Sequence, residues 1–154
     1  MDSSNMIHCH IDRSNVKVEG ARTPRQILEW TGCSVKADDA VLATMPHGSG
    51  DKAHLYLFHV GRPLDGGEMD NEYEIRGLVP ADPYTLAAFN QINPEFVEEH
   101  PNATYWRDSD GKPSCILFDE WHHHRFVNVS KDERTERGDE KVFGSRLWFA
   151  GLPK

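Results

Sequence analysis

The sequence predicts an α+β fold in which mostly antiparallel strands are accompanied by three short helices. Apolar and polar residues alternate with a period of two in several runs, as in strands with one buried face. A capping residue followed by proline, which opens a helix, occurs at Thr23, Asp82 and Asn93. The chain has 154 residues, the length of one ordinary domain, so we expect a single α+β domain over residues 1–154.

The amino-terminal part begins with two short alternating runs. Residues 7–11 alternate apolar side chains with histidines, and residues 16–18 alternate valines with a lysine. Residues 12–15 between them are turn formers, so the two runs predict a β-hairpin.

A short helix is predicted next, over about residues 24–31. Thr23 is a good N-cap, Pro24 suits the first helical position, and Gln26 completes a capping box. Gly32 is placed to end the helix in a left-handed conformation.

Two runs rich in strand-forming residues follow, at 41–45 and 54–60, and the glycine-containing loop between them predicts a second hairpin. After an acidic loop, residues 72–79 alternate again and predict a strand. The resulting order of hairpin, helix, hairpin and strand over residues 6–79 is similar to that of ubiquitin-like β-grasp folds. This similarity of topology implies an exposed sheet surface of the kind such folds use for binding.

The second half is predicted to contain two short helices, which open at Asp82-Pro83 and at Asn93-Pro94, and then more strands. Residues 103–107 and 114–118 flank a turn and predict a hairpin. Further strands are expected at 124–130 and 141–150. A boundary near residues 80–82 would divide the chain into a β-grasp-like half, 6–79, and a half of helices and antiparallel strands, 82–154.

The net charge of −8 disfavours binding to nucleic acid or to an anionic membrane surface, because an acidic protein gains nothing from phosphate contacts. The three cysteines are far apart and odd in number, which argues against a disulfide framework and against a CxxC zinc site. No apolar run reaches the roughly 20 residues that span a bilayer. With no secretory signal at the amino terminus, we expect a cytoplasmic protein.

The nine histidines are the first candidate for chemistry. On strands, His122 and His124 would share one face, and His8 and His10 would share another. If the two strands were neighbours, the four imidazoles could hold zinc, with Glu120 as the general base of a metal-dependent hydrolase. The sequence favours the alternative, a solvated polar strand segment, because the HxH spacing is common. No cofactor is therefore favoured, and zinc is the one to consider.

The loop around His47, Gly48 and Ser49 is the second candidate. This triplet is similar to the His-Gly-Ser triplet of some ADP-ribosyltransferase folds. The resemblance implies an NAD-using enzyme in which His47 and Ser49 meet the nicotinamide ribose. A glycine-rich hairpin turn explains the same residues equally well.

Five acids within ten residues form the third candidate, and only Arg62 and Arg76 flank them. The five are Asp65, Glu68, Asp70, Glu72 and Glu74. Such a one-signed cluster can dock a basic surface of a partner protein, and its alternative is an acidic solubilising loop. Because no coherent catalytic motif is present, the leading functional prediction is a small acidic module that acts by binding a protein partner.

Overall fold

The computed structural model describes residues 6–16, 23–131 and 143–154. In these residues the fold is α+β, with eight strands and five α-helices. The strands are β1 Met6–Asp12, β2 Ser34–Ala37, β3 Lys52–His59, β4 Leu78–Pro80, β5 Asn102–Arg107, β6 Pro113–Trp121, β7 His124–Lys131 and β8 Trp148–Pro153. The helices are α1 Pro24–Trp30, α2 Asp39–Leu42, α3 Gly66–Ile75, α4 Pro83–Ile92 and α5 Phe96–Glu99, with a 3-10 helix, η2, at Ser14–Val16.

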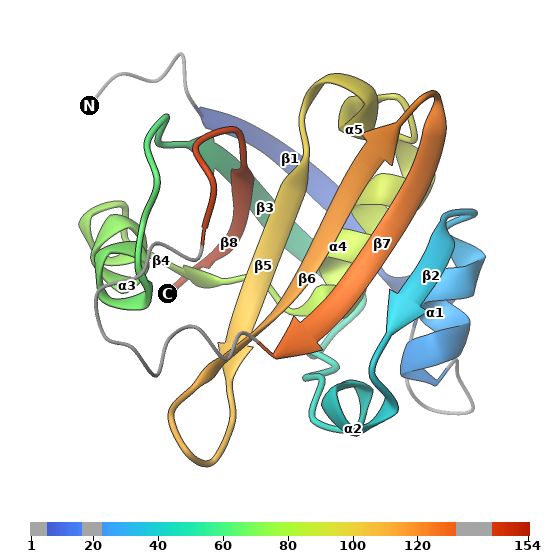
Figure 1. Cartoon of the computed structure of the whole chain (residues 1–154), viewed down its shortest axis with the longest axis horizontal. Helices are drawn as coiled ribbons and strands as arrows, with labels where there is room; N and C mark the ends of the chain where they lie inside the picture. The colour runs from blue at the N-terminus through green and yellow to red at the C-terminus, as the bar shows by residue number, and fades with distance from the viewer. Residues whose placement is uncertain (1–5, 17–22, 132–142) are drawn as a thin grey trace.

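All eight strands belong to one mixed sheet, and strands from both halves of the chain contribute to it (Figure 1). The order is β1-β3-β8-β5-β6-β7-β2, and β4 pairs with β8 beside this path. The pairs β5–β8 and β2–β7 are parallel. The prediction of a mostly antiparallel sheet was wrong, because these long-range parallel pairs leave no local signal in the sequence. The prediction of three helices was also wrong, since the described residues contain five α-helices.

The sheet forks at β8, and this fork positions the main cleft. Trp148 pairs with both His59 of β3 and Asn102 of β5. Gly151, three residues later, pairs with β3 and with Pro80 of β4. On one edge of β8, the first residues therefore pair with β5 and the last residues pair with β4. Strand β5 separates from β8 after Ala103, the second residue of β5.

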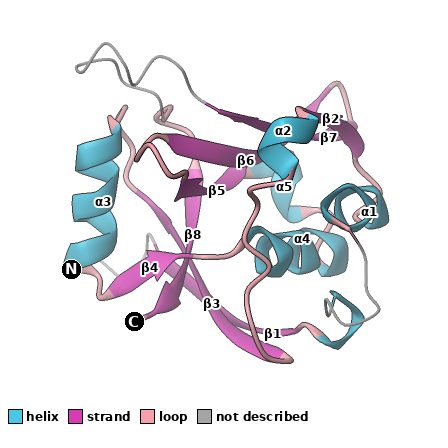
Figure 2. Cartoon of the chain, turned by 90° about the horizontal axis from the view of Figure 1, so that it is seen from below, coloured by secondary structure: helices cyan, strands magenta, loops and turns pink. Residues whose placement is uncertain are grey.

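Helix α4 forms the centre of the core, between the β1–β3 pair and the β6–β7 hairpin (Figures 1 and 2). It begins as predicted, with Asp82 as N-cap accepting a bond from the Thr85 backbone N–H at 2.9 Å and Pro83 in the first turn. Every residue from 83 to 90 is buried. One of them, Asn90, exchanges amide hydrogen bonds of 2.8 and 3.2 Å with the buried Asn102 of β5, which satisfies both side chains.

Helix α1 also follows the prediction, because its start is encoded locally. The Thr23 hydroxyl accepts from the Gln26 backbone N–H at 3.2 Å, and the Gln26 side chain accepts from the Thr23 N–H at 2.8 Å. Ile27 and Leu28 are buried against the core. Gly32 follows the helix with a φ of 83°, as expected for a residue that leaves a helix in the left-handed region.

Two predicted strands are helices instead. Residues 41–45 lie in and after α2, which begins behind the N-cap Asp38. The first half of 72–79 lies in α3, whose capping box of Asp65 and Glu68 was not recognised, and β4 contains only the last two residues of that run. Short apolar runs do not distinguish helix from strand by periodicity, so the capping residues decided both cases.

The predicted amino-terminal hairpin is also wrong. Its first strand is β1, but β1 pairs with β3 along its whole length, and Ser14–Val16 form η2. Residues 17 and 18 of the predicted partner lie outside the described residues. The observed order over residues 6–80 is therefore not the β-grasp order of hairpin, helix, hairpin and strand. The second helix of the carboxyl half begins at Phe96, two residues later than the Asn93-Pro94 pair suggested.

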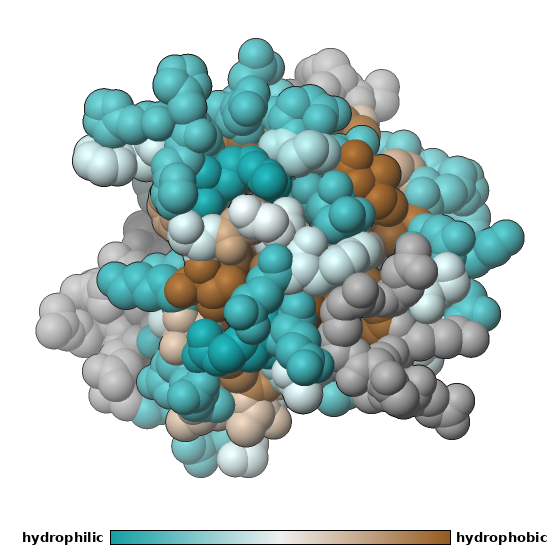
Figure 3. Space-filling view, turned by 90° about the vertical axis from the view of Figure 1, so that its right-hand side faces the viewer, coloured by the Kyte–Doolittle hydropathy of each residue, from teal (hydrophilic) through white to brown (hydrophobic). Residues whose placement is uncertain are grey.

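The surface seen from the side of α1 is mainly hydrophilic, with small separate hydrophobic areas (Figure 3). Among the described residues, the helices are too short or too polar to cross a bilayer.

Candidate functional site

A cleft with a volume of about 740 Å³ opens at the fork in the sheet. Its lining residues come from α3, from β4, from the ends of β5 and β8, and from the connection between α2 and β3. The apolar part of its lining is formed by Pro46, Ala53, Tyr73, Leu78, Val79, Pro80, Ala81, Tyr105, Trp106, Leu152 and Pro153. A volume of this size with a mostly apolar lining is typical of ligand-binding sites.

The strand β5 presents an edge to this cleft. It pairs with β6 from Asn102 to Arg107, but with β8 only at Asn102 and Ala103. In the described sheet, residues 104–107 therefore have a strand neighbour on one side only. Thr104, Tyr105 and Trp106 are buried, whereas Arg107 at the end of the strand is exposed.

The polar rim of the cleft begins at Tyr105. Its hydroxyl donates to Asp70 of α3 at 2.5 Å, and Arg107 donates to the other oxygen of Asp70 at 2.7 Å. Burial, and then the Asp70 carboxylate, raise the pKa of Tyr105, so the phenol stays protonated as a donor. The two hydrogen bonds to Asp70 connect the end of β5 to α3 at the rim of the cleft.

Four of the five acids predicted to dock a partner are divided by α3 into two pairs. Asp70 and Glu74, four residues apart, line the cleft and pair with Arg107 at 2.7 Å and Lys154 at 2.5 Å. On another side of the helix, Glu68 and Glu72 both face Arg62, at 3.1 and 3.6 Å.

Asp65, the fifth acid, is the N-cap of α3 and accepts the Glu68 backbone N–H at 2.8 Å. Each of the five thus has a partner within the chain. Their docking role stays a prediction, and the unbroken acidic loop on which it was based is a helix.

The loop at residues 46–50 is organised by Arg13, which the sequence analysis did not single out. Its guanidinium donates to the carbonyls of His47, Ser49 and Gly50 at 2.5, 2.6 and 2.8 Å, and it lies 3.4 Å from Asp82. The Arg13 side chain is only 3% exposed. The loop therefore supplies carbonyl acceptors to a buried cation beside the start of α4.

The His47-Gly48-Ser49 triplet only partly faces the cleft. Gly48 and Ser49 are among the lining residues, whereas the His47 ring packs on the Tyr84 ring at 4.8 Å. Gly48 has a φ of 74°, and a β-carbon there would lie 2.5 Å from Asp82. The glycine is thus required by the close approach of the loop to α4, which supports the turn interpretation of the triplet.

Three histidines gather on the outer face of the β1–β3 pair. His8 and His10 of β1 lie across from Tyr56 and His54 of β3 in the antiparallel register. One ligand nitrogen from each of His8, His10 and His54 lies within 4.8 Å of the others, and all three side chains are exposed. This cluster could hold a metal ion.

His54 was missed because the sequence does not reveal which strand pairs with β1. His122 and His124, which the alternative interpretation of the sequence placed beside His8 and His10, lie on the β6–β7 hairpin. Four strand spacings separate β1 from β6, about 19 Å along the sheet. The convergence of these two histidine pairs, which the sequence offered only as the alternative to a polar strand segment, is therefore not found in the described structure.

His122 and His123 form the turn of the β6–β7 hairpin. Their φ values are 50° and 64°, and Trp121 pairs with His124 on either side of them. Turn residues do not alternate as strand residues do, so His122 and His124 share no strand face. The interpretation of the whole run as a polar strand segment was therefore wrong at His122 and His123, whereas His124 begins β7.

The remaining polar residues of the hairpin are used locally. Glu120 accepts a hydrogen bond from the His123 backbone N–H and so supports the turn. His124 and Ser34 of β2 share a hydrogen bond of 2.6 Å between Nε2 and Oγ. Trp121 beside them is 70% exposed. Glu120 is thus far from the His8–His10–His54 cluster and cannot serve it as a base.

No family model matches the sequence, and no curated protein or solved structure is significantly similar to it. The functional argument therefore depends on the geometry of this chain.

Proposed function

We propose that this chain is a binding module that takes up an extended segment of a partner protein in the cleft at the fork of the sheet. The observation that carries the proposal is the edge of β5 at residues 104–107, which leaves β8 and borders an apolar cleft. Extended peptides bind such edges through backbone hydrogen bonds, and side-chain pockets beside the edge supply specificity.

The charges of the cleft support a peptide over a phosphate-bearing ligand. The lining contains three acids, Asp70, Glu74 and Asp82, and three bases, Lys52, Arg107 and Lys154. Two of the acids are already paired with two of these bases. A dinucleotide such as NAD would need an excess of cationic or N–H donors for its phosphates, and the lining offers no such excess.

A partner with a basic surface fits the charge of the whole chain. The net charge of −8 attracts basic proteins at long range and increases the rate of encounter, even where individual acids are paired. The acids of α3, including Asp65, Glu68 and Glu72 outside the cleft, lie on the element that forms one wall of the site. We place the basic residues of the partner beside the bound segment, against this helix.

A reducing compartment such as the cytoplasm completes the proposal. Cys9, Cys33 and Cys115 form no disulfide in the described structure, as is usual for cytosolic proteins.

Selection from a displayed library of random peptides tests the proposal. Selected peptides should bind the natural chain and shift the amide NMR signals of residues 78, 79, 81 and 82 and of residues 104–107. Val79→Arg changes an exposed position of the cleft wall. It should weaken binding at least about tenfold, because the arginine side chain covers the apolar lining and its charge would lose water under a bound peptide.

Ile92→Arg is the matched control, since Ile92 is also an exposed apolar residue but lies at the end of α4, outside the cleft lining. It should leave peptide affinity unchanged. Recovery of no peptide tighter than about 100 µM, or equal binding to Val79→Arg and the natural chain, would contradict the proposal.

A further inference from the structure

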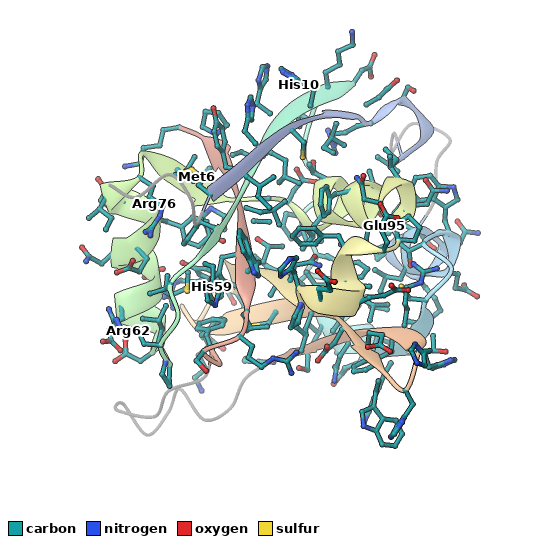
Figure 4. The ribbon with its side chains drawn as sticks, turned by 90° about the horizontal axis from the view of Figure 1, so that it is seen from above. Met6, His10, His59, Arg62, Arg76 and Glu95 are labelled. Carbon is teal, nitrogen blue, oxygen red and sulfur yellow. The ribbon has the colours of Figure 1, made fainter. Side chains whose placement is uncertain are left out.

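The register of β1 against β3 places three imidazoles on one outward surface. Side chains two residues apart share a face of a strand, so His8 and His10 point the same way. In the antiparallel pair His10 lies across from His54, and His8 lies across from Tyr56. Figure 4 shows His10 on the outer side of the β1–β3 pair, away from the helices of the core.

The three rings are close enough to share one ion. Their centroids are separated by 5.0 Å for His8–His10, 5.6 Å for His8–His54 and 4.5 Å for His10–His54. The ligand nitrogens lie within 4.8 Å of one another, whereas nitrogens about 2.0–2.1 Å from a tetrahedral zinc are about 3.4 Å apart. Because all three rings are exposed, modest side-chain rotations can close this difference.

We propose that His8, His10 and His54 bind one late first-row divalent ion, with zinc as the physiological candidate. The site is not part of the peptide-binding proposal and stands without it. Neutral imidazole nitrogens favour zinc, nickel and copper over magnesium and calcium, which prefer oxygen ligands. Cys9 between the two β1 ligands points to the opposite face of the strand, so the donor set is three nitrogens.

The surroundings favour a defined site over three independent rings. Tyr56 stacks on His8 at 4.3 Å with an interplanar angle of 13°, which limits the orientations of that ring. The three ligands come from two strands, so the ion joins β1, at the end of the sheet, to β3. Three protein ligands leave a fourth position of a tetrahedral zinc open to water or to an incoming ligand.

The ion would also lie beside the cleft, because His54 belongs both to the histidine cluster and to the cleft lining. A carboxylate or imidazole of a bound molecule could then complete the coordination. Metal binding alone does not require this contact, so the site can be tested without any peptide.

Calorimetric titration of the protein, purified without a polyhistidine tag, tests the site with zinc chloride as the probe. The natural chain should bind one equivalent. His8→Ala, His10→Ala and His54→Ala should each weaken binding at least about tenfold. All three positions are exposed, so circular dichroism should show an unchanged fold.

The double variant His122→Asn/His123→Asn is the matched control, because it removes two exposed imidazoles from the β6–β7 turn. Its affinity for zinc should equal that of the natural chain. Cobalt as a second probe should give the intense visible absorption of a four-coordinate ion, and this absorption should disappear in His10→Ala.

Three results would overturn the proposal. One is zinc binding weaker than about 100 µM. Another is an equal loss of affinity in the turn variant and in the variants of the cluster. The third is a weak cobalt spectrum of the six-coordinate type, which would indicate an ion held loosely at the surface.

Discussion

Two regions of the molecule carry three histidines each, and they organise them differently. On the β1–β3 face, His8, His10 and His54 are separated by up to 46 positions in sequence but have ligand nitrogens within 4.8 Å of one another. At the β6–β7 hairpin, three histidines are consecutive, yet two occupy the turn and the third bonds Ser34 of another strand. Adjacency in sequence is therefore a poor guide to a shared site, and cross-strand register is a better one.

The difference has a simple physical origin. A strand repeats every two residues, so alternate side chains share a face and a paired strand adds further ligands beside them. The two-residue turn of the β6–β7 hairpin has positive φ at both residues, which breaks that repeat. Histidines on the β1–β3 face therefore point the same way and can share an ion, whereas histidines in the turn point in different directions.

The largest expected difference between the two regions is the effect of zinc on stability. At a free zinc concentration about 100 times the dissociation constant, the free energy of unfolding should rise by about 2.7 kcal/mol. Urea denaturation of the natural chain, with and without a chelator, measures this change. At the same zinc concentration His10→Ala should show at most about half of this rise, and the His122→Asn/His123→Asn variant should show all of it. A similar rise in His10→Ala would separate the stabilisation from the histidine cluster.

Replacing the turn residues should have the next largest effect, and in the turn alone. His122→Asn together with His123→Gly supplies the residues that a two-residue turn with positive φ prefers, and should stabilise the fold by about 1 kcal/mol. Thermal denaturation of the metal-free protein measures it. A loss of stability would mean that the two histidines make contacts worth more than their backbone strain.

Glu120→Ala should have a smaller effect, and it separates a turn-supporting role from the role of a catalytic base. Removing the acceptor of the His123 N–H should lower the free energy of unfolding by about 0.5 kcal/mol, because the bond is local and partly exposed. Urea denaturation measures the loss. Zinc affinity should not change, and a fall in zinc affinity would place Glu120 near the ion after all.

The smallest expected effect concerns the two faces of β1. Cys9 lies between His8 and His10 in sequence but opposite Leu55, on the inward face, where burial raises the pKa of its thiol. Cys9→Ser should therefore change zinc affinity by less than about twofold, measured by the same calorimetric titration. A larger change would show that β1 is twisted or shifted from the register described.

Local signals predicted much of the secondary structure. The capping box at Thr23 and Gln26 and the Asp82-Pro83 pair each mark a helix start that the fold contains. The strands at 103–107, 114–118 and 124–130 correspond to β5, β6 and β7. The failures are the short runs at 41–45 and 72–79, whose periodicity does not distinguish a strand from a helix. In each case an overlooked N-cap, Asp38 or Asp65, marks the start of a helix.

The candidate sites could not be predicted as well, because both depend on pairing between distant strands. The cleft exists because β8, from the end of the chain, pairs with both β5 and β4. His54 joins His8 and His10 only through the β1–β3 register. Arg13 lies within residues 12–15, which were interpreted as a turn, and carried no signal of its burial. One usable clue was present, since His54 lies in a run predicted as a strand.

Nitrogen NMR of the imidazole rings during a zinc titration tests the central claim most directly, because it reports each histidine separately. One equivalent of zinc should shift the ring nitrogens of His8, His10 and His54 together and leave those of His122, His123 and His124 in place. Shifts centred on the hairpin histidines, or spread evenly over all nine rings, would contradict the account.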